Sequence, residues 1–343
     1  MKGEVNIKYP TKAEKKIIKG LHKKYNAKKV KEEKNCYLDC CNNKSINSHS
    51  FQKNGVLSSI SDENKEVYST YLPAVTFYEE PKDSYLFNVH INKASIFKGF
   101  CDEHDTKLFD PIEKGTTRNI EEYIFLNAFR GLAYTHLHEK EARISNSEFS
   151  KEVIKNPRIH QETKDLYEKI AQNKHLPDDL YRYENMKEKM LSIFSNDYTV
   201  DLEMLKKKFD VFYIEITGKQ EFLGTAATAV FNKNSKYVVC LGFLPQFKAY
   251  PNIFFVVTFK RDRSVDELLR NINNLNAQNL ERELKVVIQN TLVFTSSNIV
   301  LSKNKYFKMK KYNQLYPLKK FHIRSISGKK TDLFCDYNIE LFD

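Results

Sequence analysis

The sequence contains no tryptophan and only 10 glycines and 9 prolines among its 343 residues. This scarcity of glycine and proline argues against long flexible linkers. No apolar stretch approaches the length that spans a bilayer, and the N-terminal residues MKGEVNIKYPTKAEKK lack the apolar core of a signal peptide. We therefore expect a cytoplasmic protein without a membrane partner.

Cysteine is also scarce, but its six copies are unevenly placed. Four of them fall between Cys36 and Cys101, whereas Cys240 and Cys335 stand alone in apolar or aromatic surroundings, as expected for ordinary buried thiols. Because disulfides are rare in the cytosol, clustered cysteines indicate metal or redox chemistry there.

The composition of the chain indicates a folded, basic protein. Hydrophobic residues make up 41% of the chain, which excludes a disordered polypeptide, and the net charge is +12. An excess of positive charge favours a polyanionic partner, and nucleic acid, with DNA as first choice, is the commonest one. A lysine-rich coding bias would also make an ordinary enzyme basic.

The order of patterns along the chain predicts an α+β fold. Lysine-rich helical spacing comes first, cysteines and short strands follow, and a helical middle segment precedes β-branched and aromatic runs with a helix after them. We expect four segments: a basic helical extension (1–34), a zinc module (35–115), a helical segment (116–200) and an antiparallel sheet with packed helices (201–343). Within the module, 67–80 and 84–97 alternate as the strands of a hairpin.

Two short clusters of soft ligands carry the strongest signal. Zinc prefers four tetrahedral thiolate or imidazole ligands, often delivered as two close pairs. Cys101 and His104 lie three residues apart at the start of a predicted helix, so both side chains share one face. Cys36 with either Cys40 or Cys41 supplies the second pair, and the adjacent cysteines leave that choice open. We predict a structural Zn²⁺ site from these residues.

The order of knuckle, histidine, hairpin and helix-start pair resembles the treble-clef module of HNH-type nucleases. The resemblance covers residues 35–115 and implies that His49, in the segment NSHS, is the general base that activates water. It also implies that Asp105, next to the zinc ligand His104, approaches a catalytic Mg²⁺ or Mn²⁺ ion. Such chemistry is reasonable because neutral imidazole accepts a proton near pH 7 and a hard cation neutralises charge on phosphate.

The sequence departs from that family in two places. Ser48 stands where the family usually has an acidic residue or histidine before the base, and the expected middle asparagine is absent near Ser95 and Ile96. The phrases SHSFQKNGVLSSI, GFCDEHDTKLFDPIE and EEYIFLNAFRGL are also similar to a family of uncharacterised bacterial proteins, some associated with phage defence.

Two functions therefore remain open. The first is metal-dependent cleavage of nucleic acid by an HNH-like endonuclease. The second is a non-catalytic protein that binds nucleic acid or acts as a sensor, in which zinc only staples a small domain. The sheet segment shows no phosphate-binding glycine loop and no nucleophile elbow, so its sequence assigns no reaction to it.

Overall fold

The computed structural model describes most of the chain, in two compact units. The described residues are 10–29, 34–70, 86–172, 180–228, 235–260, 262–263, 265–296 and 298–315, together with 333, 339, 341 and 342. The first unit comprises Met1–Lys34, Leu72–Lys82 and His138–Asp178; the second comprises Asn35–Tyr71, Asp83–Leu137 and Asp179–Asp343. Among the described helices, none is long and apolar enough to cross a membrane.

Three helical segments build the first unit: α1 (Lys12–Lys29), the second half of α4 (Ile120–Lys155) and α5 (Gln161–Ala171). Apolar side chains spaced along each helix meet in a small core of Ile18, Phe149, Val153, Ile159 and Tyr167. Helix α1 lies within the basic helical extension expected over 1–34, of which residues 1–9 and 30–33 lie outside the described part.

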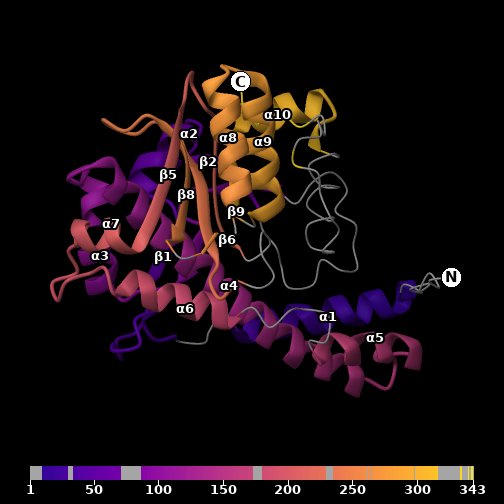
Figure 1. Cartoon of the computed structure of the whole chain (residues 1–343). Helices are drawn as coiled ribbons and strands as arrows, with labels where there is room; N and C mark the ends of the chain where they lie inside the picture. The colour runs from indigo at the N-terminus through magenta and orange to yellow at the C-terminus, as the bar shows by residue number, and fades with distance from the viewer. Residues whose placement is uncertain are drawn as a thin grey trace. The chain divides into compact units, whose positions relative to one another are not determined.

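A seven-stranded antiparallel sheet organises the second unit (Figure 1). The central strands are buried on both faces, whereas the two edge strands are partly exposed. In spatial order the strands are β3 (Leu86–His90), β2 (Glu66–Thr70), β9 (Asn298–Leu301), β6 (Phe222–Thr228), β7 (Val239–Leu244), β8 (Asn252–Phe259) and β5 (Phe209–Ile216).

Alternating residues of the central strands face two separate cores. On β6, Phe222 and Ala226 pack against α8 (Asp266–Ala277) and α9 (Glu281–Thr295), which lie along one face (Figure 1). Leu223 and Ala227 face the opposite core, which the first half of α4 shares. The remaining described helices are α2 (Ser58–Ile60), α3 (Asp102–Lys114), α6 (Leu180–Leu191), α7 (Leu202–Lys208) and α10 (Lys303–Lys311), with a π-helical turn, η1, at Lys53–Leu57.

The expected fold class, α+β with a helical middle segment and a C-terminal antiparallel sheet, is confirmed. One long helix predicted after residue 264 is instead two, because Asn279 adopts a left-handed φ of 55° between α8 and α9. The central strand β9 was not predicted. It has only four residues, which are too few to show an alternating or β-rich pattern, and it follows directly after a helix.

The segment predicted to form the zinc module, residues 35–115, contains a strand pair of its own. β1 (Asn47–His49) pairs antiparallel with β4 (Ile96–Lys98), and α3 follows directly. The hairpin predicted over 67–97 does form as β2–β3, with its turn outside the described residues, but β2 also pairs with β9 in the large sheet. The treble-clef order of knuckle, strand pair and helix is therefore present, with β2 and β3 inserted between β1 and β4.

Candidate metal centre and the adjoining polar cluster

Backbone hydrogen bonds bring the two ligand pairs together. In the knuckle, the Cys41 N–H donates to the Leu38 carbonyl at 2.9 Å, which closes a tight turn after Cys36. The knuckle is joined to the segment before α3, because the Tyr37 N–H donates to the Gly99 carbonyl at 2.7 Å. Cys101 is the N-cap of α3, so His104 follows in the first helical turn.

The four donor atoms fit one tetrahedral ion. Zn–S bonds of about 2.3 Å and Zn–N bonds of about 2.0–2.1 Å place two sulfurs about 3.8 Å apart and a sulfur and a nitrogen about 3.6 Å apart. Cys41 Sγ lies 3.8 Å from Cys101 Sγ. His104 Nδ1 lies 3.2 Å from Cys101 Sγ and 3.5 Å from Cys36 Sγ. All four donors lie within 4.8 Å of one another, so this Cys₃His group can hold a metal ion such as zinc.

The structure also decides between the two adjacent cysteines. Cys41 belongs to the cluster, whereas Cys40 is exposed and lies outside it. Cys36, Cys101 and His104 are buried. The adjacent thiols thus differ in environment although the sequence alone treats them alike.

Burial and hydrogen bonds shift the pKa values of the Cys36 and Cys101 thiols in opposite directions. Burial raises the pKa of the Cys36 thiol to about 11, although the Cys101 N–H donates to its sulfur at 3.4 Å. Burial acts in the same direction on Cys101, but the backbone N–H of His104 and contacts from the other two thiols lower its pKa below the usual value. A bound cation would favour the thiolate form of all three.

The candidate base His49 lies at the end of β1, opposite Ile96 of β4. A backbone contact with Ile91 acts to raise the pKa of its ring. Nε2 is buried and has no hydrogen-bond partner among the described residues. Burial and then the charges of Arg130 and Lys53 lower the pKa of His49 to about 4, so the ring is neutral at pH 7.

A buried arginine contacts two carboxylates of α3 and acts electrostatically on His49. The Arg130 side chain is 2% exposed, lies 4.4 Å over the Phe109 ring, and donates from Nη2 to Glu113 Oε1 at 2.9 Å. The same nitrogen is 3.5 Å from Asp105 Oδ2. Asp105 Oδ1 and the Arg130 Nε and Nη1 atoms have no hydrogen-bond partner in the described part of the chain. We call His49, Asp105, Glu113 and Arg130 the polar cluster.

Other polar residues near the cluster have structural contacts. Asp110 pairs with Lys114 along the surface of α3, and Gln52 donates from Nε2 to the Glu113 carbonyl. Ser48, in the position where an acid was expected, accepts the Phe100 N–H at 3.3 Å and therefore has a structural role.

One contact of the metal centre was not anticipated. Tyr198, 94 residues beyond His104, places its hydroxyl 2.7 Å from His104 Nε2. Its only sequence signal is the turn-prone SND segment before it, which does not indicate a partner. No protein-family profile, curated protein or solved structure matches this chain.

Proposed function

We propose that the protein cleaves nucleic acid at the polar cluster, with the Cys₃His group holding a structural zinc ion. The observation that carries the proposal is the state of His49: a ring whose pKa is lowered to about 4, and whose buried Nε2 has no partner among the described residues, within the electrostatic reach of Arg130 and Glu113. A general base must be unprotonated to accept a proton.

The residues divide the reaction among them. His49 Nε2 accepts a proton from water, whose oxygen attacks the phosphorus while the bond to the leaving oxygen breaks and solvent protonates that oxygen. Arg130 offers its unpartnered N–H groups to the phosphate oxygens. Asp105 and Glu113 are the carboxylates of the cluster that would hold Mg²⁺ or Mn²⁺, which would supply charge neutralisation on the phosphate when bound.

The cleavage assay needs a control histidine outside the cluster. His49→Ala should abolish Mg²⁺- or Mn²⁺-dependent nicking of a supercoiled plasmid and leave zinc content unchanged, because His49 is not one of the four ligands and no hydrogen bond in the described part of the chain joins it to them. His90→Ala, on β3, should cut normally. Retained nicking by the His49 variant, or no nicking by the wild type with either ion, would refute the assignment.

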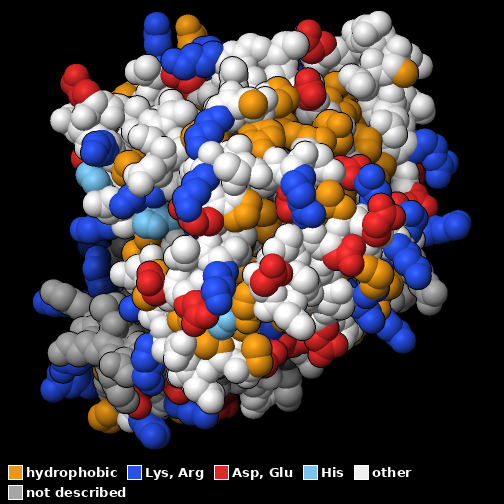
Figure 2. All heavy atoms as spheres, turned by 90° about the vertical axis from the view of Figure 1, so that its left-hand side faces the viewer, with side chains coloured by type: hydrophobic (Ala, Val, Ile, Leu, Met, Phe, Trp, Pro, Cys, Tyr) orange, Lys and Arg blue, Asp and Glu red, His pale blue; other side chains and the backbone are white. Residues whose placement is uncertain are grey.

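A binding or sensor function is the second candidate, and two observations favour it. Arg130 already neutralises the carboxylates that a catalytic ion would need, and Ser48 offers no carboxylate beside the base. For this function we expect one bound zinc ion, an affinity for nucleic acid that falls with rising salt concentration, and no cleavage of the nucleic acid. On the face drawn in Figure 2, positive and negative side chains are interspersed rather than gathered into a basic patch. A place in phage defence is proposed only from the resemblance of the three sequence phrases quoted above, and no family profile or curated protein supports it.

A further inference from the structure

The segment between α6 and α7 reaches the metal centre through one side chain. Tyr198 contacts His104 by its hydroxyl, at 2.7 Å from Nε2, and by its ring, with centroids 4.8 Å apart in an edge-on arrangement. When Nδ1 of a histidine binds a metal, Nε2 must carry the proton. Nε2 then donates to the Tyr198 oxygen, and this bond fixes both the tautomer and the plane of the ring.

Tyr198 holds this position in an unfavourable backbone conformation. Its φ is 68°, in the left-handed region that bulky residues rarely adopt. Such outliers persist where surrounding contacts determine them, and they concentrate at functional sites. No glycine or asparagine occupies the position, although either would fit the backbone better, so the side chain itself has a use there.

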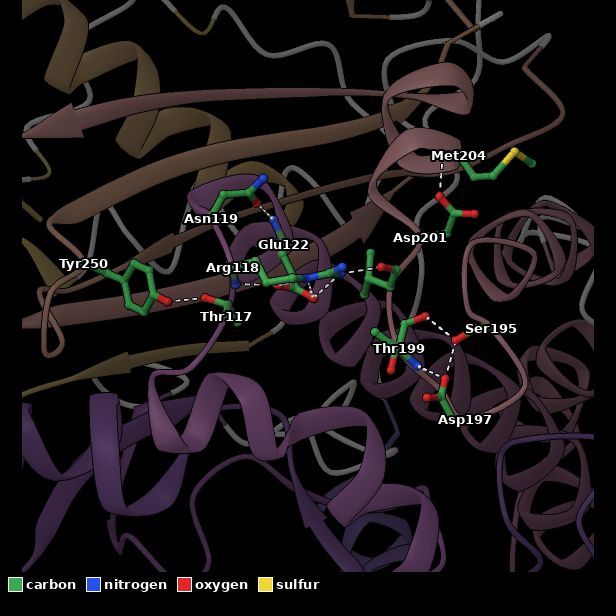
Figure 3. Close-up of polar contacts among 11 residues, drawn as sticks. Thr117, Arg118, Asn119, Glu122, Ser195, Asp197, Thr199, Asp201, Met204 and Tyr250 are labelled. Atoms are coloured by element: carbon green, nitrogen blue, oxygen red, sulfur yellow. Dashed lines mark hydrogen bonds and ion pairs between the residues drawn. The ribbon is translucent and has the colours of Figure 1, made fainter.

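A set of hydrogen bonds braces the turn on both sides of Tyr198 (Figure 3). Asp197 Oδ1 accepts from the Ser195 hydroxyl and from the Thr199 N–H, the latter at 3.2 Å. The Ser195 N–H donates to the Thr199 carbonyl at 2.9 Å, which closes the turn. The turn is therefore built as a unit, and Tyr198 lies at its tip.

The turn is also anchored to α4. Arg118 donates to the Val200 carbonyl and pairs with Glu122 at 2.7 Å, as Figure 3 shows. Beyond the turn, Asp201 caps α7 by accepting the Met204 N–H at 3.0 Å. These contacts fix both ends of the turn independently of the metal centre, so the hydroxyl of Tyr198 is presented to His104 in advance.

We propose that Tyr198 is a positioning residue of the metal centre, which orients His104 for coordination through Nδ1 and thereby raises the affinity of the Cys₃His group for zinc. This inference rests on the zinc site of the proposed function and is independent of cleavage. Outer partners of metal-binding histidines commonly contribute 10–100-fold to metal affinity.

The test compares two tyrosine-to-phenylalanine variants of the full-length protein. Tyr198→Phe keeps the ring and removes the oxygen. Tyr250→Phe is the matched control, because its hydroxyl contacts Thr117 (Figure 3), which is not one of the four residues of the metal centre. Zinc affinity is measured by competition with a chromophoric chelator, and the tautomer of His104 by ¹⁵N NMR of the zinc-loaded protein.

We expect Tyr198→Phe to bind zinc about 10-fold or more weakly, with an altered His104 Nε2–H resonance, and Tyr250→Phe to match the wild type. Equal zinc affinity in all three proteins would overturn the role of Tyr198 and leave the zinc site intact. Failure of the wild type to bind zinc would overturn the zinc site and the role of Tyr198 together. Loss of cleavage alone, with unchanged zinc affinity, would also count against the proposal.

Discussion

Two adjacent cysteines provide a sharp test of the metal centre, because substitution of either one changes a single sulfur to oxygen. Cys41 Sγ lies 3.8 Å from Cys101 Sγ within the ligand set, whereas Cys40 is exposed. Cys41→Ser removes one of four donors, and Cys40→Ser removes none. The two variants should therefore differ in zinc content although the changed residues are neighbours.

The expected size of the effect follows from linkage. Loss of an outer partner alone weakens metal sites by about 10–100-fold, so loss of a direct thiolate ligand should weaken zinc binding by at least about 100-fold. Zinc present at about 100 times its dissociation constant stabilises the folded state by about 2.7 kcal/mol. For a unit of this size that free energy corresponds to roughly 5–10 °C in melting temperature. Cys41→Ser should lose this stabilisation, and Cys40→Ser should keep it.

The assay measures zinc by mass spectrometry after gel filtration and melting temperature with and without a chelator. The wild type and Cys40→Ser should retain about one zinc per chain and melt at a lower temperature after chelation. Cys41→Ser should retain little zinc and respond little to the chelator. The reasoning fails if Cys40→Ser loses zinc while Cys41→Ser keeps it, or if chelation leaves the wild-type melting temperature unchanged.

Two further predictions concern stability in each unit. Burial acts to raise the pKa of Glu14, but hydrogen bonds from Thr11, the His160 backbone and Thr163 lower it from 4.5 to about 2. The ionised carboxylate therefore stabilises the folded state by up to about 3 kcal/mol above pH 4.5, and this contribution is lost as the pH falls toward 2. Glu14→Gln should lower the free energy of unfolding, measured by urea titration, much more at pH 7 than at pH 3. Phe100 is fully buried, and its ring packs edge-on against Phe109, with centroids 5.2 Å apart. Phe100→Ala should cost about 3–5 kcal/mol in urea unfolding of the zinc-loaded protein, and a loss below about 1 kcal/mol would show that the module core is not packed as described.

The ligand pairs were predictable because each pair is local. Cys101 and His104 are separated by one helical turn, and Cys36 and Cys41 by one tight loop, so spacing alone reveals their shared face. The strand pair next to them was harder to predict from the sequence. β1 and β4 are each three residues long, and paired residues lie about 50 positions apart in the chain. Alternation predicted the longer β2–β3 pair instead.

The polar cluster and Tyr198 show what local patterns cannot reveal. Arg130 lies on a helix with an apolar pattern, and only the folded structure shows that its head group meets α3 carboxylates and lowers the pKa of His49. Tyr198 is separated from its partner by 94 residues, and its turn carries no motif for metal binding. Long-range contacts of this kind depend on packing of the whole unit.

The geometry of α3 also explains why a structural metal ion and the polar cluster would occur together. The helix begins at the N-cap Cys101, and its first turn carries both His104, a ligand of the metal centre, and Asp105, a member of the polar cluster. Because adjacent helical residues project about 100° apart, a rotation of the first turn moves both side chains at once. A metal ion held by Cys101 and His104 would fix that rotation and so set the position of Asp105 beside Arg130. The Cys₃His group would then contribute to the polar cluster by orientation, whichever of the two proposed functions the cluster serves.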